Sequence, residues 1–310
     1  SYSERDNQIV EELSRSTGLT VDELHAFRRA REEASLASLA AQPHAAQSSH
    51  AVEAAAASDT PNVVVPSILD VNRDVLPYLI EGDIIPTKRD IDQMTKSRGK
   101  RGAPYVNTEK WDKTKPIPYF YEYDFRESGV ALVEKAMDFL SKNSCISFAL
   151  DEARQEGIRI FHFVGCNSFV GLSLDYGCQD MFTKTTAAHE LFHALGSRHE
   201  QARYDRDEYV TFDKSAAEES KIHNFKTMTA EENNNYNVSY DYGSMMHYDA
   251  DAFRKAGVTT HVLTPKDPQF ISPMGQKQVV GFTDLKQLNL MYSCTDACNP
   301  PPICKNGGFS

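Results

Sequence analysis

The run HELFHALGSRHE, residues 189–200, constrains this chain more than any other feature of its sequence. On a helix, residues four apart are separated by about 400° of rotation, so the imidazoles of His189 and His193 project from nearly one face and can bind one ion. Gly196 can adopt a backbone conformation that most other residues avoid, so we predict that it ends the helix and turns the chain back. His199 can then supply a third nitrogen.

Three neutral imidazoles leave a fourth ligand position open, which is typical of a catalytic rather than a structural zinc site. We therefore predict one Zn²⁺ ion, which lowers the pKa of a bound water towards about 7 and polarises a carbonyl group. Glu190 lies about 100° around the helix from His189, close enough to act as general base towards that water without becoming a ligand. A lone H-E-x-x-H also fits a surface helix with two solvated histidines, but Gly196 and His199 in register argue against that alternative.

Length, charge and cysteine content limit the remaining possibilities. A chain of 310 residues predicts about two folding units. The formal net charge of −11 argues against nucleic acid as a partner, because phosphate neutralisation needs clustered Lys and Arg. No run approaches the roughly 20 apolar residues that cross a bilayer, so we predict no membrane span.

The six cysteines form no C-x-x-C pair, and an even number without metal spacing predicts disulfides and therefore a secreted, extracellular protein. The sequence opens at Ser1 without an initiator Met or an apolar segment, which fits a precursor whose signal peptide has been removed or left out.

The first hundred residues differ in composition from the rest. Residues 7–34 carry a helical pattern, and residues 33–60 are rich in Ala, Ser, Gln and His, which predicts a flexible linker. A second stretch, residues 71–95, leads into the basic cluster Lys96–Arg101. Within this cluster, Arg98-x-Lys100-Arg101 resembles the cleavage site of furin-like processing proteases, and a solvated basic loop is the alternative.

Strand and helix patterns precede the histidine motif. Residues 117–123, 158–164 and 169–174 predict strands, and apolar residues recur at helical spacing from Val130 to Leu140. We expect the strands to form a sheet in one lobe of an α+β fold.

The longer run HELFHALGSRHEQARYDRD, residues 189–207, resembles the zinc signature of the astacin family, a branch of the metzincins. The run SMMHY, residues 244–248, resembles the Met-turn of that family. The resemblance covers about residues 102–294 and implies a two-lobed α+β peptidase domain with the zinc helix at its cleft. It also implies that Met246 lies beneath the metal and that Tyr248 binds zinc in the resting enzyme and stabilises the oxyanion during hydrolysis.

Two disulfides are implied by the same resemblance, Cys145–Cys294 and Cys166–Cys178, although the sequence by itself leaves the connectivity open. The sequence departs from the family at Ser197, where an aromatic residue is common.

A motif near residue 80 resembles the family's inhibitory propeptide motif, in which an aspartate after Gly binds the zinc. The resemblance implies that Asp83 takes the position of the water in the zymogen, although Gly82-Asp83 could also be an ordinary turn. The propeptide would then be residues 1–101, with its inhibitory segment at about 71–95.

Cleavage after Arg101 would create an amino terminus at Gly102. In the family, this new terminus is buried and linked to the carboxylate that follows the third histidine, here Glu200. The alternative for Glu200 is a surface carboxylate.

Substrates of metzincins bind as an added strand, which predicts main-chain contacts with Cys166 and Asn167. Arg254 and Lys255 lie where some relatives carry a basic residue that selects acidic side chains, and a solvated pair is the alternative. Asn237 begins a possible glycosylation triplet.

The tail, residues 295–310, contains Cys298-x5-Cys304 and resembles the start of an EGF-like module that the sequence does not complete, so we expect a longer protein. Taken together, the patterns predict a secreted zinc endopeptidase that a processing protease releases from a latent precursor and that acts on protein or peptide substrates. The alternative is a catalytically inactive secreted binding or adhesion protein that retains the fold.

Overall fold

The computed structural model describes residues 3–40, 67–96, 110–122, 125, 127–153, 157–161, 165–168, 173–176 and 183–297. Its α-helices are α1 (Glu4–Thr17), α2 (Val21–Ala40), α3 (Ile68–Val71), α4 (Lys88–Lys96), α5 (Glu127–Asn143), α6 (Lys184–Ala194) and α7 (Phe282–Met291). Its strands are β1 (Ile117–Tyr121), β2 (Phe148–Leu150), β3 (Ile158–Phe161), β4 (Cys166–Ser168), β5 (Ser173–Tyr176), β6 (Val210–Phe212) and β7 (Leu263–Pro265). The 3₁₀ helices of the described residues are η1 (Leu76–Tyr78), η2 (Glu200–Ala202), η3 (Arg206–Glu208), η4 (Glu219–Phe225), η5 (Pro268–Phe270) and η6 (Cys294–Ala297).

Two helices begin the described chain. The side chains of Ser3 and Asp6 form a capping box at the start of α1, and Gly18, at φ 72°, ends it. Apolar residues of α1 and α2, among them Leu13 and Phe27, are fully buried against residues 75–91. The described residues before 97 therefore form a small core, which Phe161 of β3 joins.

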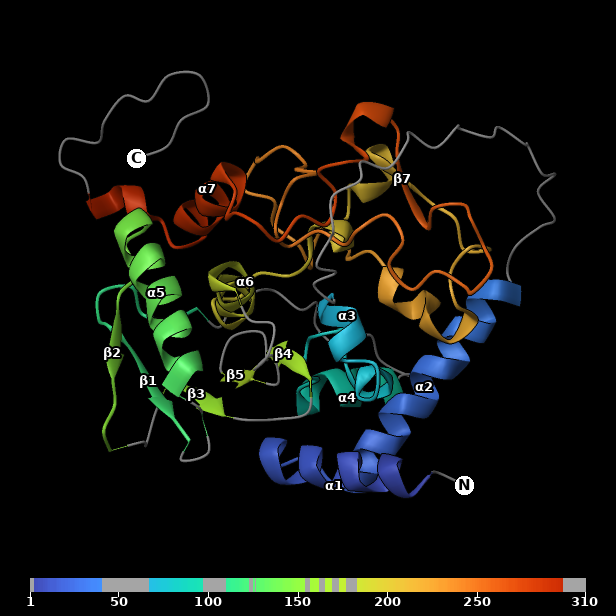
Figure 1. The fold of residues 1–310 in the computed structure, drawn as a ribbon, viewed down its shortest axis with the longest axis horizontal. Coiled ribbons are helices and arrows are strands. Elements are labelled where there is room, and N and C mark those ends of the chain that lie inside the picture. Colours follow the sequence, from blue (N-terminus) through green and yellow to red (C-terminus); the bar gives the residue numbers. More distant parts are fainter. Residues whose placement is uncertain are drawn as a thin grey trace.

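Helix α2 is longer than the sequence predicts. We expected a flexible linker from residue 33, but α2 continues to Ala40, so that prediction is wrong for residues 33–40. Ser35 in this part of α2 is fully buried, and its hydroxyl lies 2.8 Å from Nδ1 of His223 in η4. The tertiary contact stabilises a helix whose composition alone predicts little burial (Figure 1). The rest of the predicted linker lies outside the described residues.

A five-stranded sheet in the order β2-β1-β3-β5-β4 forms the first lobe. All its pairs are parallel except β4 with β5, so β4 is an antiparallel edge strand. The predicted strands at 117–123 and 158–164 correspond to β1 and β3, which end at residues 121 and 161. The predicted strand at 169–174 overlaps β5, and residues 169–172 lie outside the described part.

Helix α5 packs against α6, and both contribute to the core of the sheet lobe, with Leu140 and Leu191 fully buried (Figure 1). After α6 the chain is mostly turns and short 3₁₀ helices around the β6–β7 pair, with a second core that includes Phe225 and Val262. Cys145 and Cys294 form a disulfide. These features confirm the predicted α+β class.

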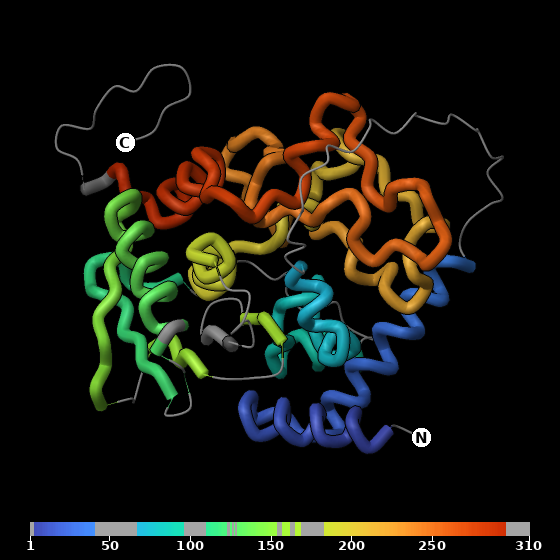
Figure 2. The backbone as a smooth tube through the Cα atoms, viewed as in Figure 1, coloured from blue at the N-terminus to red at the C-terminus, as the bar shows by residue number. Residues whose placement is uncertain are grey.

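The segment from α3 to α4 lies between the sheet lobe and the later part of the chain (Figure 2). Buried Asn72 links this segment to β4, since its side-chain amide donates to the Gly82 carbonyl at 2.8 Å and its Oδ1 accepts the Cys166 N–H. Within the described residues, no helix combines the length and apolarity needed to cross a membrane.

Two glycines with positive φ give a matched test of this fold. A Cβ on Gly157, at φ 111°, would lie 2.0 Å from the carbonyl oxygen of Pro118 in β1, whereas a Cβ on Gly257, at φ 79°, would meet nothing within 4 Å. Gly257→Ala should cost about 1–2 kcal/mol from left-handed strain alone. Gly157→Ala should cost about 1–3 kcal/mol more because of the clash. Urea unfolding of both variants measures the difference, and equal losses would contradict the β1–β3 packing.

Candidate metal centre

Helix α6 carries two of the three predicted histidines. Thr183 caps it by accepting the N–H of Thr186, and all residues from Thr185 to Ala194 are buried. The helix ends at Ala194 and Gly196 takes φ 103°, as the sequence predicts, so the chain turns and returns with His199. Glu190 is 2% exposed, with Oε1 3.6 Å from Sγ of Cys166 on the edge strand β4.

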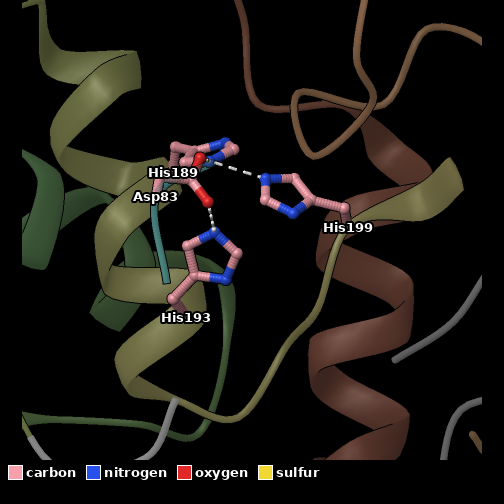
Figure 3. Close-up of side chains that lie close together, drawn as sticks. All are labelled: Asp83, His189, His193 and His199. Atoms are coloured by element: carbon pink, nitrogen blue, oxygen red, sulfur yellow. Dashed lines mark hydrogen bonds and ion pairs between the residues drawn. The ribbon is translucent and has the colours of Figure 1, made fainter. Parts of the chain in front are cut away.

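Four buried side chains meet at one point (Figure 3). Their ligand atoms, from Asp83, His189, His193 and His199, all lie within 4.8 Å of one another. Asp83 Oδ2 is 3.3 Å from Nε2 of His189 and 3.1 Å from Nε2 of His199. Asp83 Oδ1 is 3.6 Å from Nε2 of His193. The structure thus brings together the three predicted histidines and the predicted aspartate.

Backbone carbonyls determine which imidazole nitrogen faces this point. Nδ1 of His189 donates to the Met245 carbonyl at 2.9 Å, and Nδ1 of His193 donates to the Ser197 carbonyl at 2.8 Å. Because a carbonyl only accepts, each Nδ1 carries the hydrogen and each neutral ring presents the lone pair of Nε2. This tautomer is the one that binds a metal through Nε2.

The donor set fits a zinc ion. The lone pairs of His189 and His193 face a carboxylate, which is also an acceptor, so hydrogen bonds cannot satisfy the cluster. Nε2 of His193 and Oδ1 of Asp83 are buried and have no hydrogen-bond partner, which is costly in an interior. A cation at their meeting point satisfies both atoms, and three imidazole nitrogens with one carboxylate oxygen are a ligand set that zinc accepts.

The charges of the cluster support the same conclusion. Burial lowers the pKa of His189 to about 4 and that of His193 well below its usual value, so both rings are neutral and able to bind metal. For His199, burial also lowers the pKa, but the nearby Asp83 and Glu81 carboxylates outweigh it and raise the pKa to about 9. A metal ion that binds there displaces that proton.

Glu81 is a site residue that the sequence analysis missed. Its Oε2 accepts Nδ1–H of His199 at 2.9 Å, and its Oε1 accepts a hydrogen bond from Arg198 at 3.2 Å. Tyr248 donates its hydroxyl hydrogen to the Glu81 carbonyl. Glu81 has φ 49°, and this left-handed turn directs two carboxylates of one short segment to the same histidine. The only signal in the sequence was a second carboxylate two positions before Asp83.

The Met-turn residues lie beside the cluster. Met246 is 3% exposed within the core under α6, and its carbonyl accepts the Glu200 N–H at 2.9 Å. The Tyr248 ring centroid is 5.1 Å from that of His199. Because its hydroxyl hydrogen goes to Glu81, the predicted role of Tyr248 as a zinc ligand of the resting enzyme stays a prediction.

A second residue that the sequence did not reveal holds the Met-turn in place. Asp284 at the start of α7 accepts the Ser244 hydroxyl at 2.5 Å and the Met245 N–H at 3.2 Å. It lies 40 residues beyond Ser244, so no local pattern could have indicated it.

Glu200 is buried, not a surface carboxylate. Its Oε1 accepts hydrogen bonds of 2.9 Å from Arg203 and from the Asp241 N–H. Burial raises the pKa of Glu200 to about 7, although Arg203 opposes this effect. Gly102 and Arg101, the predicted partner and the predicted cleavage position, lie outside the described residues.

The edge strand predicted to bind substrate is covered in this structure. Ser168 donates its N–H to the Asp83 carbonyl at 2.8 Å, and Ile85 donates to the Ser168 carbonyl at 2.8 Å. The bridge between Ile84 and Ser168 is parallel. Cys166 and Asn167 of the same strand are fully buried. Cys166 is disulfide-bonded, and Cys178, its predicted partner, lies outside the described residues.

The other predicted side chains are not members of the metal cluster found among the described residues. Arg254 pairs with Asp251 at 2.7 Å and Lys255 with Glu219 at 3.3 Å. Asn237 is exposed, with φ 56°.

The α+β fold and the buried three-histidine centre define the class of zinc metallopeptidases. A family model described as Astacin, a peptidase family, matches residues 104–293, and the chain therefore belongs to the astacin family. The predicted family and cofactor are confirmed.

Named relatives and a solved structure agree. Zinc metalloproteinase nas-32 of Caenorhabditis elegans is 38% identical over 245 residues, which cover 75% of this chain and 36% of the relative. Zinc metalloproteinase nas-28 of the same organism is 32% identical, covering 78% of this chain and 51% of the relative. The chain thus spans about a third to a half of these relatives. The hatching enzyme high choriolytic enzyme 1 of Oryzias latipes is 31% identical at a TM-score of 0.55, covering 61% of this chain and 96% of that one.

The metal site leads to a prediction that does not depend on activity. His199→Ala removes a nitrogen that lies 3.1 Å from Asp83 Oδ2. Loss of an outer hydrogen-bond partner of a ligand lowers metal affinity by roughly 10- to 100-fold. Loss of the ligand itself should lower the zinc affinity of this variant by more than that. His261→Ala, an exposed histidine paired with Asp251, is the matched control and should bind one zinc per chain. Metal analysis after dialysis against a weak chelator measures both, and full zinc content in His199→Ala would contradict the site.

Proposed function

We propose that the chain is the latent precursor of a secreted zinc endopeptidase, with residues 1–101 as propeptide and residues 102–294 as peptidase domain. The observation that carries this proposal is the buried cluster of three imidazoles and the Asp83 carboxylate. Glu190 follows one of these histidines on α6. The propeptide and the peptidase domain come from one chain, so the ligand that blocks the site is always present at high effective concentration.

In the released domain, zinc would be held by His189, His193 and His199, where it supplies Lewis-acid polarisation of a carbonyl and a lowered pKa for water. Glu190 follows His189 on α6 and is the nearest carboxylate of that helix to the histidines. It accepts a proton from the attacking water and passes it to the leaving amine. The main chain of the substrate adds to the β4 edge at Cys166 and Asn167, which orients the scissile bond.

Latency follows from two contacts of the same segment. Asp83 occupies the position where water must enter, so Glu190 has no proton to accept. The backbone from Asp83 to Ile85 occupies the β4 edge, so a substrate strand has no place to pair. The segment pairs with β4 in the parallel direction.

Release of the segment also frees Tyr248. Its hydroxyl loses the Glu81 carbonyl as acceptor. We propose that the phenol then turns to the metal in the resting enzyme and donates to the oxyanion during hydrolysis, where a positioned hydroxyl stabilises developing charge.

Cleavage after Arg101 by a processing protease is the proposed activation step, with the new Gly102 terminus placed near Glu200. A cavity of about 40 Å³ beside Glu200 and Arg203, lined also by Asn234 and Tyr236, supports this placement. The raised pKa of the buried carboxylate marks a site where a positive partner would be stabilising.

Secretion, glycosylation and the tail belong to the same proposal. The Cys145–Cys294 disulfide supports an oxidising compartment. The exposed Asn237 is accessible to glycosylation. We assign residues 295–310 to the start of an EGF-like module and protein or peptide chains to the substrate. Arg254 and Lys255 remain candidates for substrate selection.

The latency proposal predicts that the uncleaved chain becomes active when Asp83 is replaced. Asp83→Asn removes the anionic ligand and, with it, the contact that anchors the segment on the β4 edge, so the intact chain should show measurable hydrolysis of a fluorogenic peptide. Asp22→Asn, an exposed aspartate of α2, makes the same chemical change and should stay silent. Electrophoresis must show that both chains are uncut. If neither zinc-loaded variant hydrolyses the peptide, latency through Asp83 is contradicted.

The catalytic proposal predicts a separation of binding from turnover. After trypsin or furin-type cleavage, Glu190→Gln should keep its zinc but lose about 10²- to 10⁴-fold in kcat, the usual contribution of a general base. Glu208→Gln, an exposed glutamate, is the control and should match the wild type. Metal analysis and peptide hydrolysis are measured on the same samples. If Glu190→Gln still hydrolyses the peptide, another group is the base. If the cleaved wild type does not hydrolyse it, an inactive binding protein is favoured.

A further inference from the structure

Arg31 is a buried cation on α2 that forms no salt bridge among the described residues. Its side chain is 2% exposed, and no carboxylate of the described residues lies within salt-bridge distance of it. Nη2 donates to Asn224 Oδ1 at 2.5 Å, and the guanidinium lies 5.2 Å from the Phe27 ring centroid. Nη1 is buried and has no hydrogen-bond partner. A buried guanidinium with an unused N–H group requires an acceptor.

His223 presents a second unused group beside Arg31. The Ser35 hydroxyl accepts the His223 backbone N–H at 3.3 Å and lies 2.8 Å from Nδ1. In the tautomer in which the Ser35 hydroxyl donates to Nδ1, the neutral imidazole carries its own hydrogen on Nε2. Nε2 is buried and has no partner. Burial, with help from Arg31 and Lys221, lowers the pKa of His223 to about 2, so the ring is neutral at physiological pH.

Both side chains line one cleft. It has a volume of about 960 Å³ and lies between the N-terminal helices and the segment that includes η4. Its lining also includes Lys214 and Lys226, neither of which is paired with a carboxylate among the described residues. The other lining arginines have partners, since Arg198 pairs with Glu81 and Arg206 with Asp207. The lining also includes the carboxylates of Asp90 and Glu232, which accept hydrogen bonds from Thr87 and Thr229, whereas Arg31, Lys214 and Lys226 form no salt bridge among the described residues.

We propose that Arg31 and His223 form a binding site for a small oxyanion, such as phosphate, at the contact between α2 and η4. The planar guanidinium supplies charge-assisted N–H groups, and the neutral imidazole supplies one more. A neutral ligand or water would satisfy the hydrogen bonds but leave the buried charge uncompensated, which favours an anion.

The site exists only while α2 is docked, because Arg31 belongs to the N-terminal segment and His223 to the later part of the chain. An anion that binds both therefore stabilises the docked arrangement. This regulatory consequence rests on the proposed latency, whereas the binding site does not. The two can fail separately, because anion binding is measured on the intact chain without any assay of peptide hydrolysis.

The test is titration of the intact, zinc-loaded chain with inorganic phosphate in a calorimeter, with sulfate and acetate as further probes. Chloride at matched ionic strength controls for screening, and concentrations stay below about 10 mM so that exclusion of salt from the surface is negligible. We expect saturable binding of one phosphate per chain and a thermal midpoint that rises with phosphate concentration. Preference for acetate over phosphate would identify a carboxylate as the ligand class within the same proposal.

Variants locate the binding. Arg31→Gln should weaken phosphate binding by about tenfold or more, since it removes a charge-assisted contact. Arg29→Gln, an exposed arginine on the same helix, should bind as the wild type does. His223→Phe keeps Arg31 and should weaken binding by a smaller factor, so it serves if Arg31→Gln prevents docking of α2, as checked by limited proteolysis. The proposal is overturned if the wild type shows no saturable binding, or if neither Arg31→Gln nor His223→Phe weakens it.

Discussion

The structure depends on three imidazole nitrogens that converge on one buried point. Two of them are fixed by hydrogen bonds from Nδ1 to carbonyls, one in the turn after α6 and one in the Met-turn. The Met-turn is itself tied to α7 through Asp284. Helix, turn and Met-turn therefore form one unit, because none can shift without misdirecting a nitrogen. This explains why so irregular a lobe, built mostly of turns, can support a site that needs fixed geometry.

The N-terminal segment contacts the same unit of helix, turn and Met-turn through several side chains and does more than fill the cleft. Successive residues Glu81 and Gly82 both have positive φ, which places the carboxylate of Glu81 on the outer nitrogen of His199 and that of Asp83 on its inner nitrogen. Tyr248 and Asn72 hold the carbonyls of the same turn. A non-glycine residue in the left-handed region persists only where its surroundings compensate for the strain. Here the compensation comes from the contacts of this turn with His199, Tyr248 and Asn72.

Local chemistry made much of this predictable. The helix bearing His189 and His193, the turn at Gly196 and the α+β class follow from spacing and periodicity, and the resemblance to the astacin family added Asp83. Long-range contacts were not predictable in the same way. Residues 33–40 read as a linker because Ala and Ser bury little area, yet Ser35 is fully buried against η4. Glu81 looked ordinary because its function depends on the φ of its own turn, which composition does not encode.

Charge explains why the closed state can be so thoroughly buried. In the proposed zinc-bound state, the Asp83 and Glu81 carboxylates oppose the charges of a divalent cation and Arg198, and such a group can be desolvated at far lower cost than an isolated ion. In the proposed activation, removal of the N-terminal segment would take both carboxylates away together and leave three neutral imidazoles as the first ligands. We expect the cleft then to become more positive, and a carbonyl oxygen or oxyanion is what such a field attracts. Under the proposed latency, a single cleavage would both open the cleft and change its electrostatic character, because the Glu81 and Asp83 carboxylates lie on one short turn.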